Sequence, residues 1–204
     1  MQRVLRAVFS TVIVTLIAGA DACSSDAPPA PVPDVVMDFG TPEDFWSSPF
    51  PGEHRRGPDG NIDLTAFPSN RVDLVDQIRA ALADAEGFGT TSAIFFPLGV
   101  DVDETLLPAE TDAPTTDGPV LLVDVDPASP ERGSLRPISG WFQSDGGPFG
   151  APHLLSILPV QGVPLRAGTL YAAVVTTALH TTTGEALERA DAIDLIADGI
   201  APDG

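Results

Sequence analysis

The sequence predicts a mostly β protein, an antiparallel β-sandwich with one amphipathic helix near its N-terminal side. Proline and glycine number 21 and 19 among 204 residues, a density that disfavours an all-helical bundle. Only the segment 71–86 has clear helical periodicity. From residue 92 onward, short β-branched or aromatic runs alternate with Pro, Gly and Asp turns, and no long helical pattern separates them. A parallel sheet with crossover helices is therefore disfavoured.

The predicted helix spans 71–86. Its apolar side chains recur on one face: Val72, Val75, Ile78 and Leu82. Asn70 is the expected N-cap and Gly87 the expected end. We expect a packed amphipathic helix without a functional role. Before it, the aromatic residues Phe45, Trp46 and Phe50 are expected to form an arm that packs on the core.

Five or six strands are expected after the helix, with candidate runs at 92–96, 119–125, 137–143, 153–160 and 170–179. Trp141 and Phe142 are adjacent on one of them, so their side chains face opposite sides of the sheet. One of the two belongs to the core. The other is expected to cover a sheet edge or to contact a partner or sugar.

Residues 1–22 have the features of an export signal. Arg3 and Arg6 precede the uncharged run 7–20, which is too short to span a bilayer of about 30 Å comfortably. Small residues at positions 20 and 22, the −3 and −1 positions, indicate a cleavage site directly before Cys23. Cys23 is the only cysteine, so the chain cannot form an internal disulfide.

A lone cysteine directly after such a cut resembles the lipidation site of bacterial lipoproteins, whose thiol receives a diacylglyceryl group. The sequence departs from the usual pattern in having Ala20 and Asp21 before Cys23. The resemblance implies an exported protein of the cell envelope, attached to a membrane through a lipid on Cys23. The alternative is a soluble secreted protein cut at the same place. The proline-rich residues 23–44 would then form a tether.

The charge balance excludes one class of partner. The chain has 29 acidic and 10 basic residues and a net charge of −19, so nucleic-acid binding is not expected. The same charge repels anionic headgroups, which leaves the lipid as the route to the membrane.

The sequence predicts no catalytic residue and no cofactor. It has no G-x-S-x-G segment, and a triad of Ser139 or Ser144 with His153 has no support from a motif. Zinc-ligand spacings and a phosphate-binding loop are also missing from the sequence. Alternating carboxylates at Asp101, Asp103, Asp124 and Asp126 are weak candidates for calcium ligands, against the preferred interpretation as strand ends and turns.

Residues 164–187, PLRAGTLYAAVVTTALHTTTGEAL, resemble the closing hairpin of bacterial Ig-like domains. In those domains a Pro-Leu-x-x-Gly-Thr-x-Tyr motif enters a strand. The resemblance implies an Ig-like β-sandwich over 45–190, with Gly168 in a tight turn and the Tyr171 hydroxyl bonded to backbone upstream, as in a tyrosine corner. Residues 191–204 would be a tail, or the start of a missing domain.

Two further segments, GFGTTSAIFFPLGVDVDETLLP (87–108) and VLLVDVDPASPERG (120–133), are similar to the N-terminal Ig-like module of exported bacterial lipases of the virulence-factor type. Two functions are compatible with this. The chain is a non-catalytic spacer, docking or binding module for a protein partner or a C-terminal domain. Alternatively, it is the leading part of a lipase or esterase whose α/β-hydrolase domain lies beyond this chain.

Overall fold

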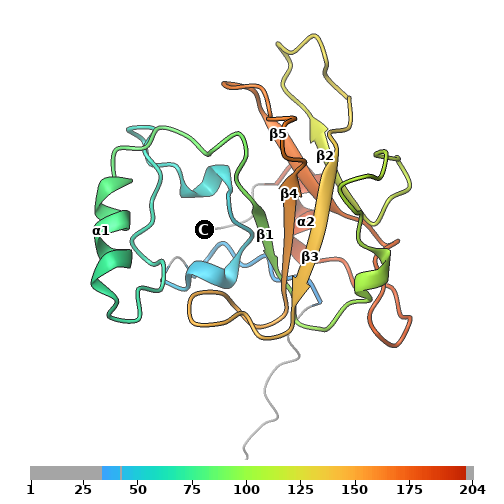
Figure 1. Cartoon of the computed structure of the whole chain (residues 1–204), viewed down its shortest axis with the longest axis horizontal. Helices are drawn as coiled ribbons and strands as arrows, with labels where there is room; N and C mark the ends of the chain where they lie inside the picture. Colours follow the sequence, from blue (N-terminus) through green and yellow to red (C-terminus); the bar gives the residue numbers. More distant parts are fainter. Residues whose placement is uncertain (1–33, 42, 201–204) are drawn as a thin grey trace, which may run out of the picture. The chain divides into compact units, whose positions relative to one another are not determined.

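The structure is a computed structural model that describes residues 34–41 and 43–200. The predicted signal peptide, Cys23 and the tether up to residue 33 lie outside the described residues. The described chain is mostly β and contains two antiparallel sheets, which confirms the predicted mostly β, antiparallel class. The strands are β1 (Ile94–Pro97), β2 (Val120–Asp124), β3 (Ile138–Gln143), β4 (Leu154–Pro159) and β5 (Tyr171–Val175). One sheet has the order β1-β4-β3 and the other the order β2-β5 (Figure 1).

The core lies between the two sheets because inward side chains alternate along the strands. On β2 the burial alternates from Val120 to Asp124, as a strand with one covered face requires. Leu155 of the central strand β4 pairs with Phe96 of β1 on one side and Phe142 of β3 on the other, and all three are buried. These side chains pack in one cluster with residues of β2. This arrangement is compatible with a sandwich.

The structure separates the adjacent aromatic residues of β3. Phe142 is buried in the core, whereas the Trp141 side chain is 67 % exposed on the other face of the sheet. β3 is an edge strand of its sheet. Trp141 is therefore the surface aromatic of the pair.

An aromatic arm covers part of the outer side of β1. Phe45 is 2 % exposed, and its ring lies 5.0 Å from Phe50 and 4.9 Å from Phe67, measured between centroids. Trp46 contacts Phe95 of β1 edge to face. The arm therefore packs on the outer face of β1, and Phe45, Trp46 and Phe50 lie outside the core cluster between the sheets. The arm also includes the short 3-10 turns η1 (Phe45–Ser47) and η2 (Glu53–Arg55).

The helix in the predicted segment 71–86 is shorter than expected and lies in a different environment. α1 spans Asp73–Ala81, with Val72 as its N-cap, and Asn70 has a positive φ of 48°. Gly87 does not end it. The prediction of a packed amphipathic helix is wrong, since none of the residues of α1 is buried.

The position of α1 follows from its anchors. Arg79 donates a hydrogen bond to the Leu64 carbonyl at 3.0 Å and another to the Thr65 carbonyl, so the helix is held by the loop before it. Figure 1 shows α1 to one side of the strands. The aromatic arm already covers β1 on this side, which leaves Ile78 half exposed.

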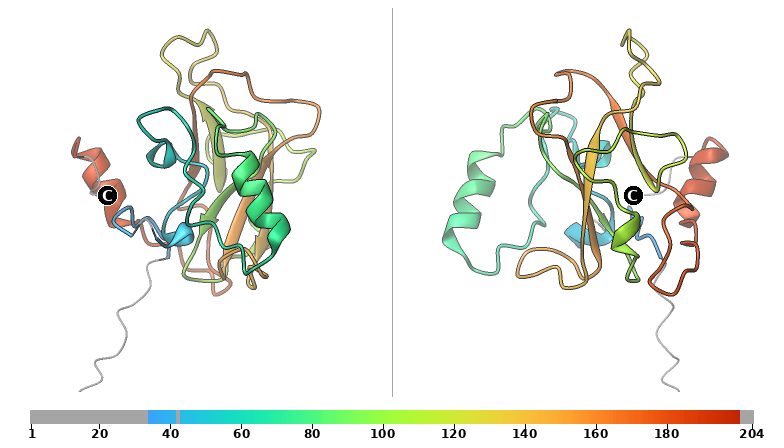
Figure 2. Two further views of the ribbon diagram at one scale, coloured as in Figure 1. Left: turned by 90° about the vertical axis from the view of Figure 1, so that its left-hand side faces the viewer. Right: turned by 45° about the vertical axis from the view of Figure 1, so that its right-hand side comes forward.

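A second short helix, α2 (Asp191–Ala197), follows the strands in the predicted tail. Ala190 and Ala192 are buried at its start, whereas Leu195 and Ile196 are exposed. Figure 2 shows both helices outside the strands from two further directions. Across residues 34–41 and 43–200, no helix has the length and apolar character needed to cross a membrane.

Candidate functional site

The site begins where β5 starts, at a corner built from Gly168 and Tyr171. Gly168 has a φ of +63°, a left-handed conformation that glycine adopts without strain, and this produces a tight turn before the strand. The Tyr171 hydroxyl then accepts a hydrogen bond from the Arg166 backbone N–H at 3.0 Å. This is the local contact that the tyrosine-corner prediction describes.

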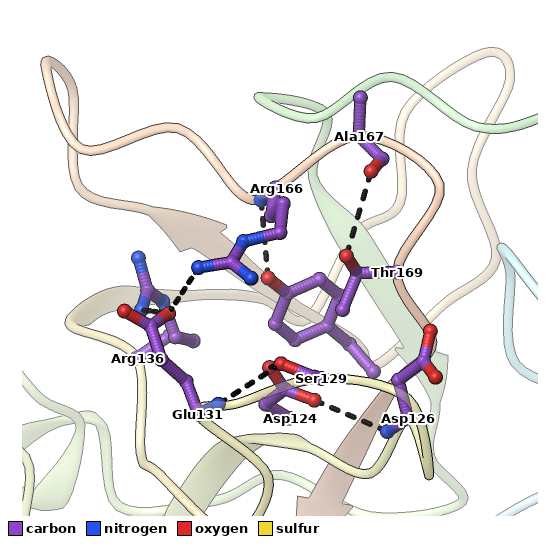
Figure 3. A network of polar contacts seen from close by, with 9 residues as sticks. Asp124, Asp126, Ser129, Glu131, Arg136, Arg166, Ala167 and Thr169 are labelled. Atoms are coloured by element: carbon purple, nitrogen blue, oxygen red, sulfur yellow. Dashed lines mark hydrogen bonds and ion pairs between the residues drawn. The ribbon is translucent and has the colours of Figure 1, made fainter.

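Asp124, directly across from Tyr171 in the β2–β5 pair, holds the loop that follows β2. Its side chain is 1 % exposed, and a buried carboxylate needs hydrogen-bond donors. It accepts bonds from the Ser129 hydroxyl at 2.5 Å and from the Asp126 backbone N–H at 3.1 Å. Figure 3 shows this network of polar contacts. Asp124 therefore fixes the end of β2 and its loop together.

Asp126 connects this loop to the turn before β5. Its carboxylate accepts hydrogen bonds from the Ala128 N–H at 2.8 Å and from the Leu170 N–H at 3.2 Å. The second bond joins segments that are far apart in the sequence. The two sides of the corner are thus held by backbone-to-carboxylate contacts.

Glu131 adds an ionic contact at the surface of the corner. Its carboxylate lies 3.3 Å from Arg136 and 3.3 Å from Arg166. The Glu131 and Arg166 side chains are each 46 % exposed, so each ion pair contributes little stability, about 0–1 kcal/mol. The pair with Glu131 holds the side chain of Arg166 (Figure 3), the residue whose backbone N–H bonds to the Tyr171 hydroxyl.

A cleft of about 500 Å³ lies beside this corner. Its apolar lining comes from both sheets and from the turn before β5: Ile94, Leu122, Leu165 and Ala173. Charged residues also line it: Glu53, Arg56, Glu86, Asp126 and Arg166. An apolar lining with charged groups among it is typical of a binding site. The described residues that line the cleft include no histidine or cysteine to serve as a base or nucleophile.

A second polar cluster joins Asp101, Ser144 and His153. Asp101 accepts a hydrogen bond from the Ser144 hydroxyl at 2.6 Å and lies 2.7 Å from Nδ1 of His153. A nucleophilic triad requires the histidine between the serine and the acid. Here the acid lies between the other two, so the cluster does not have the order of a Ser-His-Asp triad.

The four candidate calcium ligands occupy local hydrogen-bond networks. Asp103 caps the turn η3 (Glu104–Leu106), accepting bonds from the Thr105 N–H and hydroxyl. Because β2 ends at Asp124, Asp126 lies beyond the strand, and the two carboxylates do not share a strand face. Within the described ranges, no three His, Cys, Asp or Glu side chains gather as a metal site would require.

Sequence reasoning found Gly168 and Tyr171 but missed the residues that complete the corner: Ser129, Glu131, Arg136 and Arg166. Of their contacts, the Glu131–Arg166 pair joins the loop after β2 to the turn before β5 (Figure 3). The only local signal was the Asp126-Pro127 dipeptide, which marks a turn.

Comparisons of this chain with models of protein families, with curated proteins and with solved structures find no match. The geometry of the site therefore carries the functional argument.

Replacing Tyr171 by phenylalanine is expected to lower the free energy of unfolding by about 0.5–1.5 kcal/mol, because the Arg166 N–H loses its acceptor. Thermal unfolding would show this as a decrease in Tm of roughly 2–4 °C per kcal/mol. Thr169→Val is the matched control, since its hydroxyl makes only a long 3.4 Å contact with the Ala167 carbonyl. Equal losses in both variants would contradict the role assigned to the Tyr171 hydroxyl.

Asp101 is expected to make stability sensitive to acid. Hydrogen bonds from Ser144 and then from His153 hold the pKa of its carboxyl below the usual range. A folded-state pKa below the unfolded value gives stability that is present above about pH 4 and lost as the pH falls through the folded-state pKa. Asp101→Asn should therefore lower Tm at pH 7, and the deficit relative to wild type should narrow below about pH 4.

The control for this experiment is Asp117→Asn. Asp117 is exposed and accepts no side-chain hydrogen bond from the described residues. We expect it to leave Tm unchanged at pH 7. A deficit in Asp101→Asn that stays constant through the acid range would contradict the assigned role of the ionised carboxylate.

Proposed function

We propose that this protein is an exported lipoprotein of the bacterial cell envelope whose Ig-like domain acts as a docking module and has no catalytic activity of its own. The observation that carries the docking role is the cleft beside the Tyr171 corner, with its apolar lining and its charged groups. Such a site offers area and polar contacts for a ligand.

The strand order supports the Ig-like part of the proposal. Ig domains of the constant type place strands B, E and D together in one sheet and strands C and F in the other. If β1 to β5 correspond to strands B to F, the expected sheets are β1-β4-β3 and β2-β5, which are the orders observed. Tyr171, at the start of β5, then has the position of a tyrosine-corner residue at the start of strand F.

The lipid anchor rests on the sequence before the described residues. Arg3 and Arg6 precede an uncharged run, and small residues lead to the single cysteine, Cys23. A chain of net charge −19 gains no attraction from anionic headgroups, so acyl chains on Cys23 would have to provide the attachment. The proline-rich segment after Cys23 would hold the domain away from the membrane surface.

Intact-mass analysis of the protein purified from membranes tests the anchor. We expect a mass that corresponds to cleavage before Cys23 plus a diacylglyceryl group and any further acyl chain. A mass without acylation would overturn the lipoprotein assignment. In parallel, the same preparation should be incubated with ester, glycoside and peptide substrates, and turnover of any of them, lost in no-protein controls, would overturn the non-catalytic assignment.

A second function is favoured by the similarity of residues 87–108 and 120–133 to the leading module of exported lipases. These segments contain β1 and β2 together with the loop that Asp124 holds. Under this proposal the chain would be the leading part of a lipase or esterase. The same mass spectrum separates the two functions, because it also reports the true C-terminus. A product extending past Gly204 into a G-x-S-x-G domain would favour the lipase.

A further inference from the structure

Three of the four sheet edges are covered by neighbouring backbone. Phe50 exchanges hydrogen bonds with Phe95 at the edge formed by β1, at 3.0 and 2.6 Å. At the edge formed by β3, the Gly140 N–H donates to the Pro108 carbonyl at 2.8 Å. At the edge formed by β2, the Arg136 N–H donates to the Leu122 carbonyl, also at 2.8 Å. The fourth edge belongs to β5.

The register identifies which peptide groups of β5 point away from β2. The Val125 N–H donates to the Leu170 carbonyl and the Thr176 N–H to the Pro119 carbonyl, so even-numbered residues of this segment bond to the β2 side. In an antiparallel pair the alternate residues point the other way. The outward peptide groups are therefore those of Tyr171, Ala173 and Val175.

These groups have no backbone partner within residues 34–41 and 43–200. The strand, Tyr-Ala-Ala-Val-Val, also has none of the features that protect exposed edges, since it contains no charged residue and no proline. Val174 is 38 % exposed on it. An apolar edge strand with free peptide groups is a ready template for another strand.

The cleft runs beside the same strand. Its lining includes Tyr171 and Ala173 of β5, Ile94 of β1, Leu122 of β2 and Leu165. A strand added to β5 would extend the β2-β5 sheet and direct every second side chain toward this cleft. The free edge and the apolar volume are thus two separate observations at one place.

We propose that the open edge of β5 binds an extended segment of a partner protein as an added strand, with apolar side chains alternating with basic ones. This inference deepens the proposed docking function and rests on it. Backbone hydrogen bonds to Tyr171, Ala173 and Val175 supply affinity, and apolar side chains in the cleft supply specificity. Three acidic residues line the cleft, Glu53, Glu86 and Asp126, against two arginines. Both arginines, Arg56 and Arg166, are already paired with glutamates, so on a chain of net charge −19 the cleft selects a cationic segment.

Other occupants fit less well. The segment 24–33 of this chain carries proline at positions 28, 29, 31 and 33, and proline cannot donate to a strand ladder. A second copy would bring another charge of −19. Its β5 would also have its inward side chains committed to its own core, so it could not fill the cleft. A separate extended segment can both pair with the edge of β5 and place apolar side chains in the cleft.

The test uses a heptapeptide of alternating lysine and valine, with both ends blocked, titrated into the purified full-length protein. The peptide should bind, and its glutamate-valine counterpart should bind at least tenfold more weakly. Two N-methylated versions sharpen the test, one modified at every valine and one at every lysine. Because alternate residues of a strand bond on opposite edges, one of the two should lose binding at least tenfold and the other should keep it.

Amide hydrogen exchange measures directly whether the outward N–H groups of β5 are hydrogen-bonded. In the free protein, Tyr171, Ala173 and Val175 should exchange quickly, whereas the β2-bonded Ala172 and Val174 are protected. Adding the peptide should slow the first three. If these three amides are already as protected as their neighbours in the free protein, the edge is covered and the proposal is wrong.

Ala173→Pro removes the central outward N–H and keeps the bonds of β5 to β2, so peptide binding should fall at least tenfold. Trp141→Ala, on the other sheet, should leave it unchanged. Glu86→Gln should weaken binding several-fold, in contrast to Glu110→Gln outside the cleft. If Ala173→Pro does not fold, the N-methylated peptides and the exchange data still decide.

Several outcomes would overturn the inference. They are failure of the lysine-valine peptide to bind, equal binding of both N-methylated peptides, and self-association of the protein that Ala173→Pro abolishes, which would make a second copy the occupant. None of these experiments depends on acylation of Cys23. A protein that is acylated on Cys23 and ignores all the peptides would therefore remove this inference and leave the proposed anchoring in place.

Discussion

Replacing Cys23 by serine is expected to move the protein from the membrane fraction to the soluble fraction. Acyl chains contribute about 0.8 kcal/mol per buried CH₂, and two chains give a lasting anchor where one gives marginal binding. A serine hydroxyl cannot form the thioether that carries the diacylglyceryl group. The acidic domain offers no second means of attachment. Ultracentrifugation of cell lysates, followed by quantification in pellet and supernatant, measures the change.

Ser24→Ala is the matched control, because it changes the neighbouring side chain and keeps the thiol. It should stay in the pellet, and a high-salt wash should not release it. If Cys23→Ser also stays in the pellet after that wash, a lipid on Cys23 is not what holds the protein to the membrane.

Leu155→Ala is expected to lower the free energy of unfolding by about 2–5 kcal/mol, the range for a leucine removed from a packed core. Leu155 is 0 % exposed on the central strand β4, between Phe96 and Phe142 on the neighbouring strands. The two aromatic residues belong to different strands of the sheet, so neither can move to fill the cavity without disturbing its own pairing. Urea denaturation, with the midpoint and slope fitted separately, measures the loss.

Leu158→Ala provides the comparison within the same strand. Its side chain points to the other face of β4 and is only partly buried. The same atoms are removed, but most of the resulting space opens to solvent, so the loss should be clearly smaller. Similar losses at both positions would mean that the space between the two sheets is not the main source of stability.

The strands could be predicted because the pattern that indicates each strand lies within a few consecutive residues. The run at 119–125 is almost continuously apolar and rich in valine, which indicates a strand, and β2 alternates buried and half-buried residues along it. The adjacent Trp141 and Phe142 required opposite faces, and the structure buries Phe142. A period of two fixes which side chains share a face, and the abundance of apolar residues ensures that one face is covered.

The environment of the helix could not be predicted in the same way. Periodicity indicates which side chains of 71–86 share a face, but it does not reveal whether a vacant surface exists to receive them. Here the arm residues Trp46 and Phe50 already contact β1, through contacts that span more than forty positions in the sequence. The apolar face of α1 is left exposed as a result.

The corner was predictable only in part for a similar reason. Gly168 and Tyr171 lie within one short motif, and the hydroxyl contact to Arg166 spans five positions. By contrast, the bond from the Leu170 N–H to Asp126 spans 44 positions. Such a contact depends on the pairing of β2 with β5, so it can be recognised only once the register is known.

The contrast between the two tryptophans makes the protein its own fluorescent reporter. The indole N–H of Trp46 is bonded to the Phe149 carbonyl at 2.8 Å inside the aromatic arm, whereas the Trp141 ring is mostly in water. Their emission maxima and their accessibility to acrylamide must therefore differ. With Trp141 replaced by phenylalanine, the remaining signal follows the seating of the arm alone, so that its detachment can be timed separately from the collapse of the strands.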